Sequence, residues 1–455
     1  MFEFIIANFV SVVIFLIVLS ILILVHEWGH FITAKKVGVR VDEFSLGFGP
    51  KLWSVKKGDT EYMVKAIPLG GYVKMAGDER GKCSGRPEEF FSKSAGLRSL
   101  VVVNGPMVNF VLAYVCLVFV FYLGYPALST KIEYVDPGGP AARAGILVGD
   151  KITGINNQIV YGWHNMDERV MESRTENVVV TLVRNGHERT VSVVPQVIKK
   201  PDLLGIEHQV RDLGIDDSST VIGHVSENYP AYEAGLREGD RITRVNGRPV
   251  ERWEDVRHLI ADSSAESIEV LWIREGSEMG RRIIPKQVTF GKKIINQIGI
   301  APRQNIDVFK VGFKDALVFS AEKLVEIISL TFRSLYHMII GDISARETMT
   351  GPIGIFYLVK SAADTGFSQL LFIMGMISAS LAIFNLLPII PLDGGHLLLY
   401  GIEKFRGKPL SEKVEDVFMR LGVGLILLLA AYVFYSDFSR FGWIDGIMNI
   451  FVNHK

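Results

Sequence analysis

The stretch "LVHEWGHFITAKK", residues Leu24 to Lys36, decides the fold of this chain. It contains a His-Glu-x-x-His pattern formed by His26, Glu27 and His30, and it ends a run from Phe4 to Val25 that has no charged residue. A helix needs about 20 apolar residues to cross a bilayer. The run is too long for a signal-peptide core, has no basic start, and no small-residue cleavage pattern follows it. We therefore expect a transmembrane helix over residues 1–34 that stays attached and carries the pattern.

The pattern itself indicates a metal. Positions i and i+4 lie on one face of a helix, so His26 and His30 can bind a single zinc ion. Glu27 is then placed to hold and deprotonate a water on that ion, whose pKa zinc brings to about 7. The alternative is a chance match, with two histidines at a helix end near the membrane interface. Ionisable residues at membrane depth cost free energy, which favours the functional interpretation.

Three further segments have the length and composition of membrane spans. They are charge-free over Leu100–Leu128, Thr365–Leu392 and Leu421–Ser436. The last has 16 residues, which is short unless its ends reach the headgroups. A mean hydropathy of +0.27 and 49% hydrophobic residues agree with several spans. We expect a polytopic α-helical membrane protein with about four transmembrane helices, the later three over residues 99–126, 365–400 and 421–443.

The basic residues of the loops predict the orientation. The loop over residues 35–98 contains 13 Lys and Arg, and the loop over 401–420 is also basic. Loops rich in these residues stay on the cytoplasmic side. The N-terminus, the tail over 444–455 and the large middle segment should then lie on the opposite side.

The middle segment contains a duplication. "GPAARAGILVGDKITGINNQIV" (139–160) and "YPAYEAGLREGDRITRVNGRPV" (229–250) align without gaps at an offset of 90, with 10 of 22 positions identical. Gly-Asp turns, alternating strands and the hairpin signals "VRNGHE" and "IREGSE" indicate β-rich copies. The shared pattern resembles PDZ domains, so we expect two inserted β-rich PDZ domains over 127–203 and 204–305. Such domains bind peptide C-termini at a sheet edge. The alternative is that the copies only space or shield the membrane part.

A third metal ligand is needed, and the stretch "NLLPIIPLDGGH" (Asn385 to His396) offers Asp393. It follows 28 uncharged residues, so it should reach the same membrane face as the His pair. We expect Gly394 and Gly395 to break the helix beside it. The alternatives are that Asp393 caps the next helix, or that Asp42 or Glu43 supplies the ligand.

Two segments next to the spans have their own patterns. "TEYMVKAIPLGGYVKMAG" (60–77) shows apolar alternation, a bend at Gly70 and Gly71, and Tyr72 after it. This predicts a membrane-associated β-hairpin that could take an extended substrate by strand addition. The alternative is an ordinary surface hairpin. Asp307–Gly341 shows apolar residues at helical spacing, which predicts amphipathic helices within 306–364, on the outer membrane surface or against the β-rich pair.

Charge and cysteine content exclude some functions. Lys+Arg and Asp+Glu both total 49, so no nucleic-acid partner is expected. Cys83 and Cys116 are the only two cysteines and lie in different surroundings, so neither a disulfide framework nor a cysteine metal site is expected.

Taken together, "HEWGH", "NGPMVNF" (Asn104–Phe110), the repeated pair and "NLLPIIPLDGG" resemble the site-2 protease family of intramembrane zinc metalloproteases, in the same order over nearly the whole chain. The resemblance implies that His26, His30 and Asp393 bind Zn²⁺ and that Glu27 is the catalytic base. It also implies that residues of the family pattern, Asn385 and Pro388, contact the substrate, as could Gly71 and Tyr72 of the hairpin.

The same resemblance implies a function. We expect a bacterial inner-membrane endopeptidase, with its termini and PDZ pair periplasmic and its active site near the cytoplasmic face. It would make the second cut in regulated intramembrane proteolysis, within single-span substrates whose outer domain has been removed: an anti-sigma factor of the envelope stress response and possible remnant signal peptides. The alternatives are a membrane-anchored PDZ adaptor without proteolytic activity and a zinc transporter or sensor.

Overall fold

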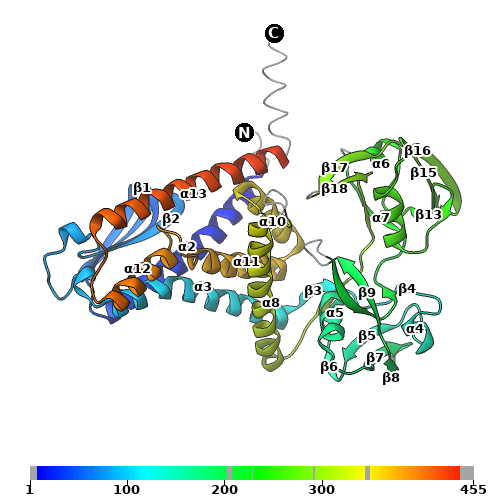
Figure 1. The fold of residues 1–455 in the computed structure, drawn as a ribbon, viewed down its shortest axis with the longest axis horizontal. Helices are drawn as coiled ribbons and strands as arrows, with labels where there is room; N and C mark the ends of the chain where they lie inside the picture. Colours follow the sequence, from blue (N-terminus) through cyan, green and yellow to red (C-terminus); the bar gives the residue numbers. More distant parts are fainter. Residues whose placement is uncertain (1–7, 202–206, 228, 291–292, 344–348, 441–455) are drawn as a thin grey trace, which may run out of the picture. The chain divides into compact units, whose positions relative to one another are not determined.

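A computed structural model describes residues 8–201, 207–227, 229–290, 293–343 and 349–440. The chain forms two compact units (Figure 1). The first comprises Met1–Tyr125, Lys310–Tyr336 and Thr348–Lys455, and the second comprises Pro126–Phe309 and His337–Glu347. The predicted tail over 444–455 and the first seven residues lie outside the described ranges.

The first unit is a helical bundle with one β-hairpin. Its helices are α2 (Phe9–Lys36), α3 (Ala95–Leu123), α8 (Phe313–Ile340), α10 (Pro352–Thr365), α11 (Phe367–Asn385), α12 (Asp393–Arg406) and α13 (Glu412–Arg440), with short 3₁₀ turns at Arg80–Lys82 and Phe90–Ser92. Four segments in the described part of the chain are long and apolar enough to span a membrane: Phe9–Lys36, Ala95–Leu123, Phe367–Asn385 and Lys413–Phe438. The four predicted spans are therefore found, and the last begins about eight residues earlier than expected, because the charged residues before Leu421 are already helical in α13.

Small residues let the central helices α2, α3 and α11 approach closely, as is usual inside membranes. Ala113 of α3 and Ala379 of α11 are fully buried in one shared cluster. A Cβ at Gly375 of α11 would lie 3.2 Å from the Cβ of Cys116 and 3.3 Å from the carbonyl oxygen of Ala113. The helix that carries the His pair therefore sits in a bundle held by van der Waals packing.

The helices expected within 306–364 are present, but they belong to the bundle. α8 packs through Leu324 and Ile327 on Ala113 and Leu117 of α3. α10 packs through Val359 on Val18 and Leu22 of α2. The amphipathic pattern was correctly interpreted as helical, and part of its apolar surface packs on the bundle, which hydrophobic spacing alone does not reveal.

The third span ends earlier than predicted. Residues 365–400 were expected as one segment broken at Gly394 and Gly395, but α11 ends at Asn385 and α12 begins at Asp393, so both glycines are helical. The break is the connection 386–392, which contains Pro388 and Pro391. A Cβ at Gly394 would lie 2.1 Å from the carbonyl oxygen of Leu386. The glycines therefore let α12 pack against this connection.

The predicted hairpin is confirmed. Strands β1 (Val41–Lys57) and β2 (Thr60–Met75) pair antiparallel, and both bend. The bends let Leu46 of β1 lie opposite both Gly71 and Val64 of β2. The segment Gly71–Met75 therefore flanks the first half of β1 on one side only.

The second unit contains the two repeats. Elements of the first part are β3 (Tyr125–Leu128), β4 (Tyr134–Val135), α4 (Pro140–Arg143), β5 (Lys151–Ile155), β6 (Gln158–Ile159), α5 (Trp163–Glu172), β7 (Val178–Arg184), β8 (His187–Val193), β9 (Gln196–Pro201), β10 (Glu207–Asp212) and β11 (Ile215–Asp216). Those of the second are β12 (Ile222–Val225), α6 (Pro230–Glu233), β13 (Arg241–Val245), β14 (Arg248–Pro249), α7 (Trp253–Ala261), β15 (Ile268–Arg274), β16 (Ser277–Ile283), β17 (Lys286–Phe290), β18 (Lys293–Gln297), β19 (Ile300–Pro302) and β20 (Ile306–Phe309).

The duplication is visible in sheet order, core and ion pairs. The sheets run β6-β5-β7-β8 and β14-β13-β15-β16. Buried core positions recur at the offset of 90, as with Leu182 and Trp272. Arg184 Nε donates to Asp150 Oδ1 at 2.6 Å. In the second copy, Arg274 Nε donates to Asp240 Oδ1 in the same way, at 2.7 Å. Both copies therefore share one fold.

The predicted boundary between the copies, at 203/204, is wrong. β11 (Ile215–Asp216) pairs with β4 (Tyr134–Val135), and Leu213 is buried in the first core. In the second copy β19 pairs with β12 in the corresponding way. Each copy therefore closes by returning its last strand to its first, and the first copy extends to Asp216.

Candidate metal centre

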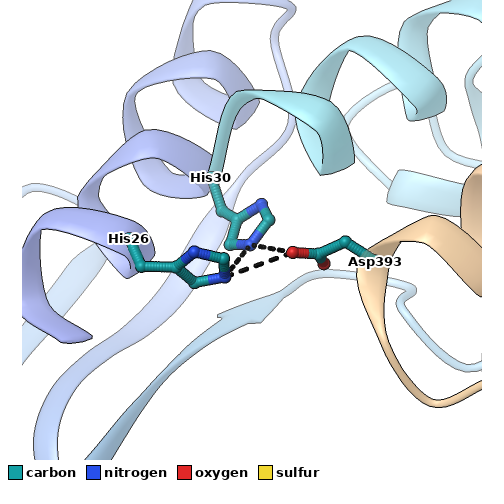
Figure 2. A group of neighbouring side chains, drawn as sticks. All are labelled: His26, His30 and Asp393. Carbon is teal, nitrogen blue, oxygen red and sulfur yellow. Dashed lines mark hydrogen bonds and ion pairs between the residues drawn. The ribbon is translucent and has the colours of Figure 1, made fainter. Parts of the chain in front are cut away.

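Three side chains from α2 and the start of α12 converge on one point (Figure 2). His26 Nε2 lies 3.1 Å from His30 Nε2 and 3.2 Å from Asp393 Oδ2, and His30 Nε2 lies 3.6 Å from the same oxygen. Two ligands held about 2.1 Å from a tetrahedral zinc ion are about 3.4 Å apart. The spacing of these three atoms therefore fits a zinc ion.

The environment of these atoms also fits a metal. His26 and His30 are each 9% exposed, and Asp393 Oδ2 is a buried oxygen without a hydrogen-bond donor directed at it. A buried carboxylate oxygen without a donor costs free energy unless a cation compensates it. Two imidazole nitrogens and one carboxylate oxygen form a donor set that zinc prefers in catalytic sites, where a fourth position stays open.

A backbone carbonyl orients His30. Its Nδ1 lies 3.0 Å from the carbonyl oxygen of Val101 in α3. A ring that donates through Nδ1 leaves the Nε2 lone pair free to bind a metal.

Glycines bring α3 close to the His pair. A Cβ at Gly105 would lie 2.3 Å from His30 Nε2 and 3.0 Å from His26 Cε1. A Cβ at Gly29 would lie 2.4 Å from the carbonyl oxygen of Asn104. The Asn104 amide also donates to the carbonyl oxygen of Gly29 at 3.0 Å. The two helices therefore cross at the metal ligands.

One more side chain of α3 touches a ligand. Asn109 is fully buried, and its Nδ2 lies 3.4 Å from His26 Nδ1. The stretch "NGPMVNF" contributed to the sequence-based prediction only through a family resemblance, and none of its residues was assigned a role. The signal that could have identified these residues is the combination of asparagines and a glycine in this stretch, which lies against Gly29 of the His pattern.

Glu27 lies beside the three ligands. Its side chain is half-buried and interacts electrostatically with His26, His30 and Asp393. A Cβ at Gly71 of the hairpin would come 3.2 Å from Glu27 Cγ. Gly71 is thus brought to the site, as expected of a hairpin that reaches the active centre.

Tyr72 points elsewhere. Its hydroxyl donates to Glu43 at 2.5 Å and accepts from Lys65 at 2.8 Å, and its ring stacks on Phe48. Side chains of adjacent strand residues point to opposite faces, which separates Tyr72 from Gly71. The bond from Tyr72 and the nearby Lys74 hold the pKa of the Glu43 carboxyl below its ordinary value. Glu43 is therefore engaged on the hairpin, which excludes it as the third ligand proposed as an alternative.

The two residues of the family pattern before Asp393 lie on the chain that leads to it. Asn385 is the last residue of α11 and is half-buried, and Pro388 is exposed in the connection to α12. Both are therefore within one short connection of the metal ligand.

Comparisons with known proteins show the family of the chain. The model of a family described as "Peptidase family M50" matches residues 14–429. The chain is similar to the regulator of sigma-E protease RseP of Escherichia coli (strain K12), with 34% identity over 444 residues that cover 94% of this chain and 98% of that protein. It is 32% identical, over 94% of this chain and 98% of the relative, to a Neisseria meningitidis protein whose name contains the words "zinc metalloprotease".

Proposed function

The chain belongs to peptidase family M50, whose members are zinc metalloproteases, and we propose that it cuts its substrates within the membrane. The proposed reaction is the second cut in regulated intramembrane proteolysis, in the spanning segment of a single-span protein that has already lost its outer domain. The observation that carries this proposal is the convergence of His26, His30 and Asp393 beside Glu27, at the end of an apolar helix.

Each residue of the centre has a proposed role. His26, His30 and Asp393 would hold Zn²⁺, which when bound supplies a Lewis acid that makes water acidic near neutral pH and polarises a carbonyl. Glu27 would accept the proton of the attacking water and return it to the leaving amine. Its half-buried position beside the ligands supports this role.

A spanning helix must unwind before it is cut, because its carbonyls are hydrogen-bonded within the helix. We propose that the hairpin segment Gly71–Met75 holds the unwound substrate as an added strand. This segment pairs with β1 on one side, and no other strand in the described part of the chain pairs with it. Asn385 and Pro388 would contact the substrate near Asp393. Tyr72 would act only through its contacts within the hairpin.

The proposed substrate is an anti-sigma factor. This rests on the name of the Escherichia coli relative, which describes a protease that regulates sigma-E. Remnant signal peptides are a second proposed substrate class. We propose an inner-membrane location with the termini and the two repeats in the periplasm. The repeats would act as PDZ domains that bind peptide C-termini or exclude substrates with a bulky outer domain.

The test is cleavage of a model single-span substrate by the purified protein. The wild type, Glu27→Gln and, as a matched control, the exposed Glu238→Gln of the second repeat are compared, each with its zinc content measured. We expect Glu27→Gln to keep zinc and lose cleavage by at least about 100-fold, as expected for loss of a general base. Cleavage by Glu27→Gln at the wild-type rate would favour the alternative, a membrane-anchored adaptor without proteolytic activity.

A further inference from the structure

Asn109 of α3 contacts the imidazole of a proposed zinc ligand through its side-chain amide. Its side chain is fully buried, its Nδ2 lies 3.4 Å from His26 Nδ1, and its Oδ1 has no hydrogen-bond donor facing it. Its backbone oxygen accepts a bond from Ser378 of α11 at 2.8 Å, which fixes the position of the residue. A polar side chain buried this deeply needs a partner for its oxygen.

The two ligand histidines differ in what faces their second nitrogen. His30 Nδ1 faces a carbonyl oxygen, that of Val101, which can only accept. A histidine that gives Nε2 to a metal carries its proton on Nδ1 and therefore needs an acceptor there. For His26, the side chain that faces Nδ1 within the described residues is that of Asn109.

The Asn109 amide can supply this acceptor. Amide oxygen and nitrogen are nearly equal in size, so the side chain can turn over within the same space. Turning places Oδ1 against His26 Nδ1 and gives that oxygen a donor. The NH₂ group then takes the former place of the oxygen. The turned orientation is favoured by free energy because an imidazole N–H makes a stronger hydrogen bond when its ring binds a cation.

We propose that Asn109 is the positioning residue of His26, with its amide oxygen accepting the Nδ1–H bond that holds the ring toward the metal. This inference rests on the proposed function, since it takes His26 as a zinc ligand. Asn109 does not contact substrate in this proposal. It acts on the orientation and protonation of one ligand, and therefore on zinc affinity.

Asn104 provides a matched control. It is the same residue type on the same helix, but its contacts use the amide NH₂ as a donor instead of the amide oxygen as an acceptor. Its Nδ2 donates to the carbonyl oxygen of Gly29 and to Thr33 Oγ1, at 3.0 and 2.7 Å. Asn104 therefore needs its donor, whereas Asn109 needs its acceptor. Replacement by Asp, which has acceptors only, should separate the two.

The experiment measures zinc affinity of the full-length purified protein by chelator competition, together with the visible spectrum of the Co²⁺-loaded protein. We expect Asn109→Leu, which lacks an acceptor, to weaken zinc binding about 10–100-fold and to change the Co²⁺ spectrum. Asn109→Asp should bind zinc at least as tightly as the wild type. Asn104→Asp should lower the thermal stability, because the α2–α3 bonds lose their donor.

Two outcomes would overturn the proposal. One is wild-type zinc affinity in a folded Asn109→Leu protein, and the other is equal loss of affinity in Asn109→Asp and Asn109→Leu. If the Leu variant does not fold, Asn109→Ala removes the acceptor with less crowding and replaces it. His26→Ala is measured alongside. If it keeps wild-type zinc affinity, the proposed metal site itself is refuted. If His26→Ala loses zinc while Asn109→Leu keeps it, only the proposed role of Asn109 is refuted.

Discussion

The proposed metal centre depends on a glycine as much as on its proposed ligands. A Cβ at Gly105 would overlap the position of His30 Nε2, at 2.3 Å. Gly105→Ala must therefore displace the ring or separate α2 from α3. We expect loss of most of the bound zinc and a destabilisation of about 1–3 kcal/mol from overpacking. Metal analysis and thermal unfolding of the purified variant measure both.

The control for this substitution lies on the same helix. A Cβ at Gly96, in the first turn of α3, would meet no atom within 4 Å. Gly96→Ala should keep wild-type zinc and stability. Equal zinc content in the two variants would mean that the close approach at Gly105 does not constrain the imidazole.

A second residue controls the loop before α3. The Glu89 carboxylate accepts bonds from the Ser84 hydroxyl and from the backbone N–H groups of Ser84, Gly85 and Arg86. The bond from the Ser84 side chain is the largest cause that lowers the pKa of Glu89 to about 2, from an ordinary value of 4.5. Because the pKa is lower in the folded protein, these bonds stabilise the loop above pH 4.5, and the stabilisation is lost as the pH falls toward 2.

This predicts an acid-sensitive loop. Hydrogen exchange of residues 80–92, corrected for intrinsic rates, should rise as the pH is lowered from about 4.5 to about 2. In Glu89→Gln the loop should exchange faster already at neutral pH, and its protection should change little in acid. A wild-type loop whose protection is the same at both ends of this range would contradict the prediction.

At the scale of elements, α13 contacts the bundle at two places along its length. A Cβ at Gly422 would come 1.5 Å from the carbonyl oxygen of Ile390, in the connection before Asp393. Asp437, 1% exposed, accepts the backbone N–H groups of Gly351, Ile353 and Gly354 at the start of α10. Asp437 thus caps a helix from a different part of the chain. A Cβ at Gly351 would lie 2.5 Å from Asp437 Oδ2, so a glycine at this position leaves room for the carboxylate.

Asp437→Ala should loosen α13 from α10. Loss of a helix cap costs about 0.5–2 kcal/mol, and the three N–H groups would be left without their acceptor. Thermal unfolding and the yield of an engineered disulfide between α13 and α10 measure the effect. The control is Asp416→Ala on the same helix, where the side chain is 72% exposed and pairs only loosely with Arg420. A similar response of the two variants would refute the role of the cap.

The break between α11 and α12 illustrates what the sequence could show at this scale. Prolines and glycines indicated an irregular segment before Asp393, and such a segment exists. Which of them break the helix depends on packing: Gly394 and Gly395 are helical because α12 lies against the backbone of residues 386–390. Propensity cannot reveal a backbone contact between two consecutive elements.

At the scale of the whole molecule, the repeats differ from the sequence-based division. Leu213 belongs to the first core although the predicted boundary placed it in the second copy. Leu213→Ala should therefore destabilise the first repeat by about 2–5 kcal/mol and leave the second unchanged. Limited proteolysis of the full-length protein, with cut sites assigned by mass spectrometry, shows which repeat opens.

The matched variant is Ile298→Ala, since Ile298 is buried in the core of the second repeat. It should open the second repeat and spare the first. If Leu213→Ala opened the second repeat instead, the strand pairing between β11 and β4 would not define the boundary.

The sequence by itself determined the spans, the His-Glu-x-x-His face, the hairpin and the duplication, because each is a local or periodic pattern of residue types. Only the tertiary structure decided what surrounds the metal ligands and where the repeats close. The partners of His30 and His26 in α3 are 71 and 83 residues away, and the cap of α10 is more than 80 residues from the glycines it binds. Such contacts depend on where helices cross and on which strands pair, and the spacing of residues along the chain does not determine either.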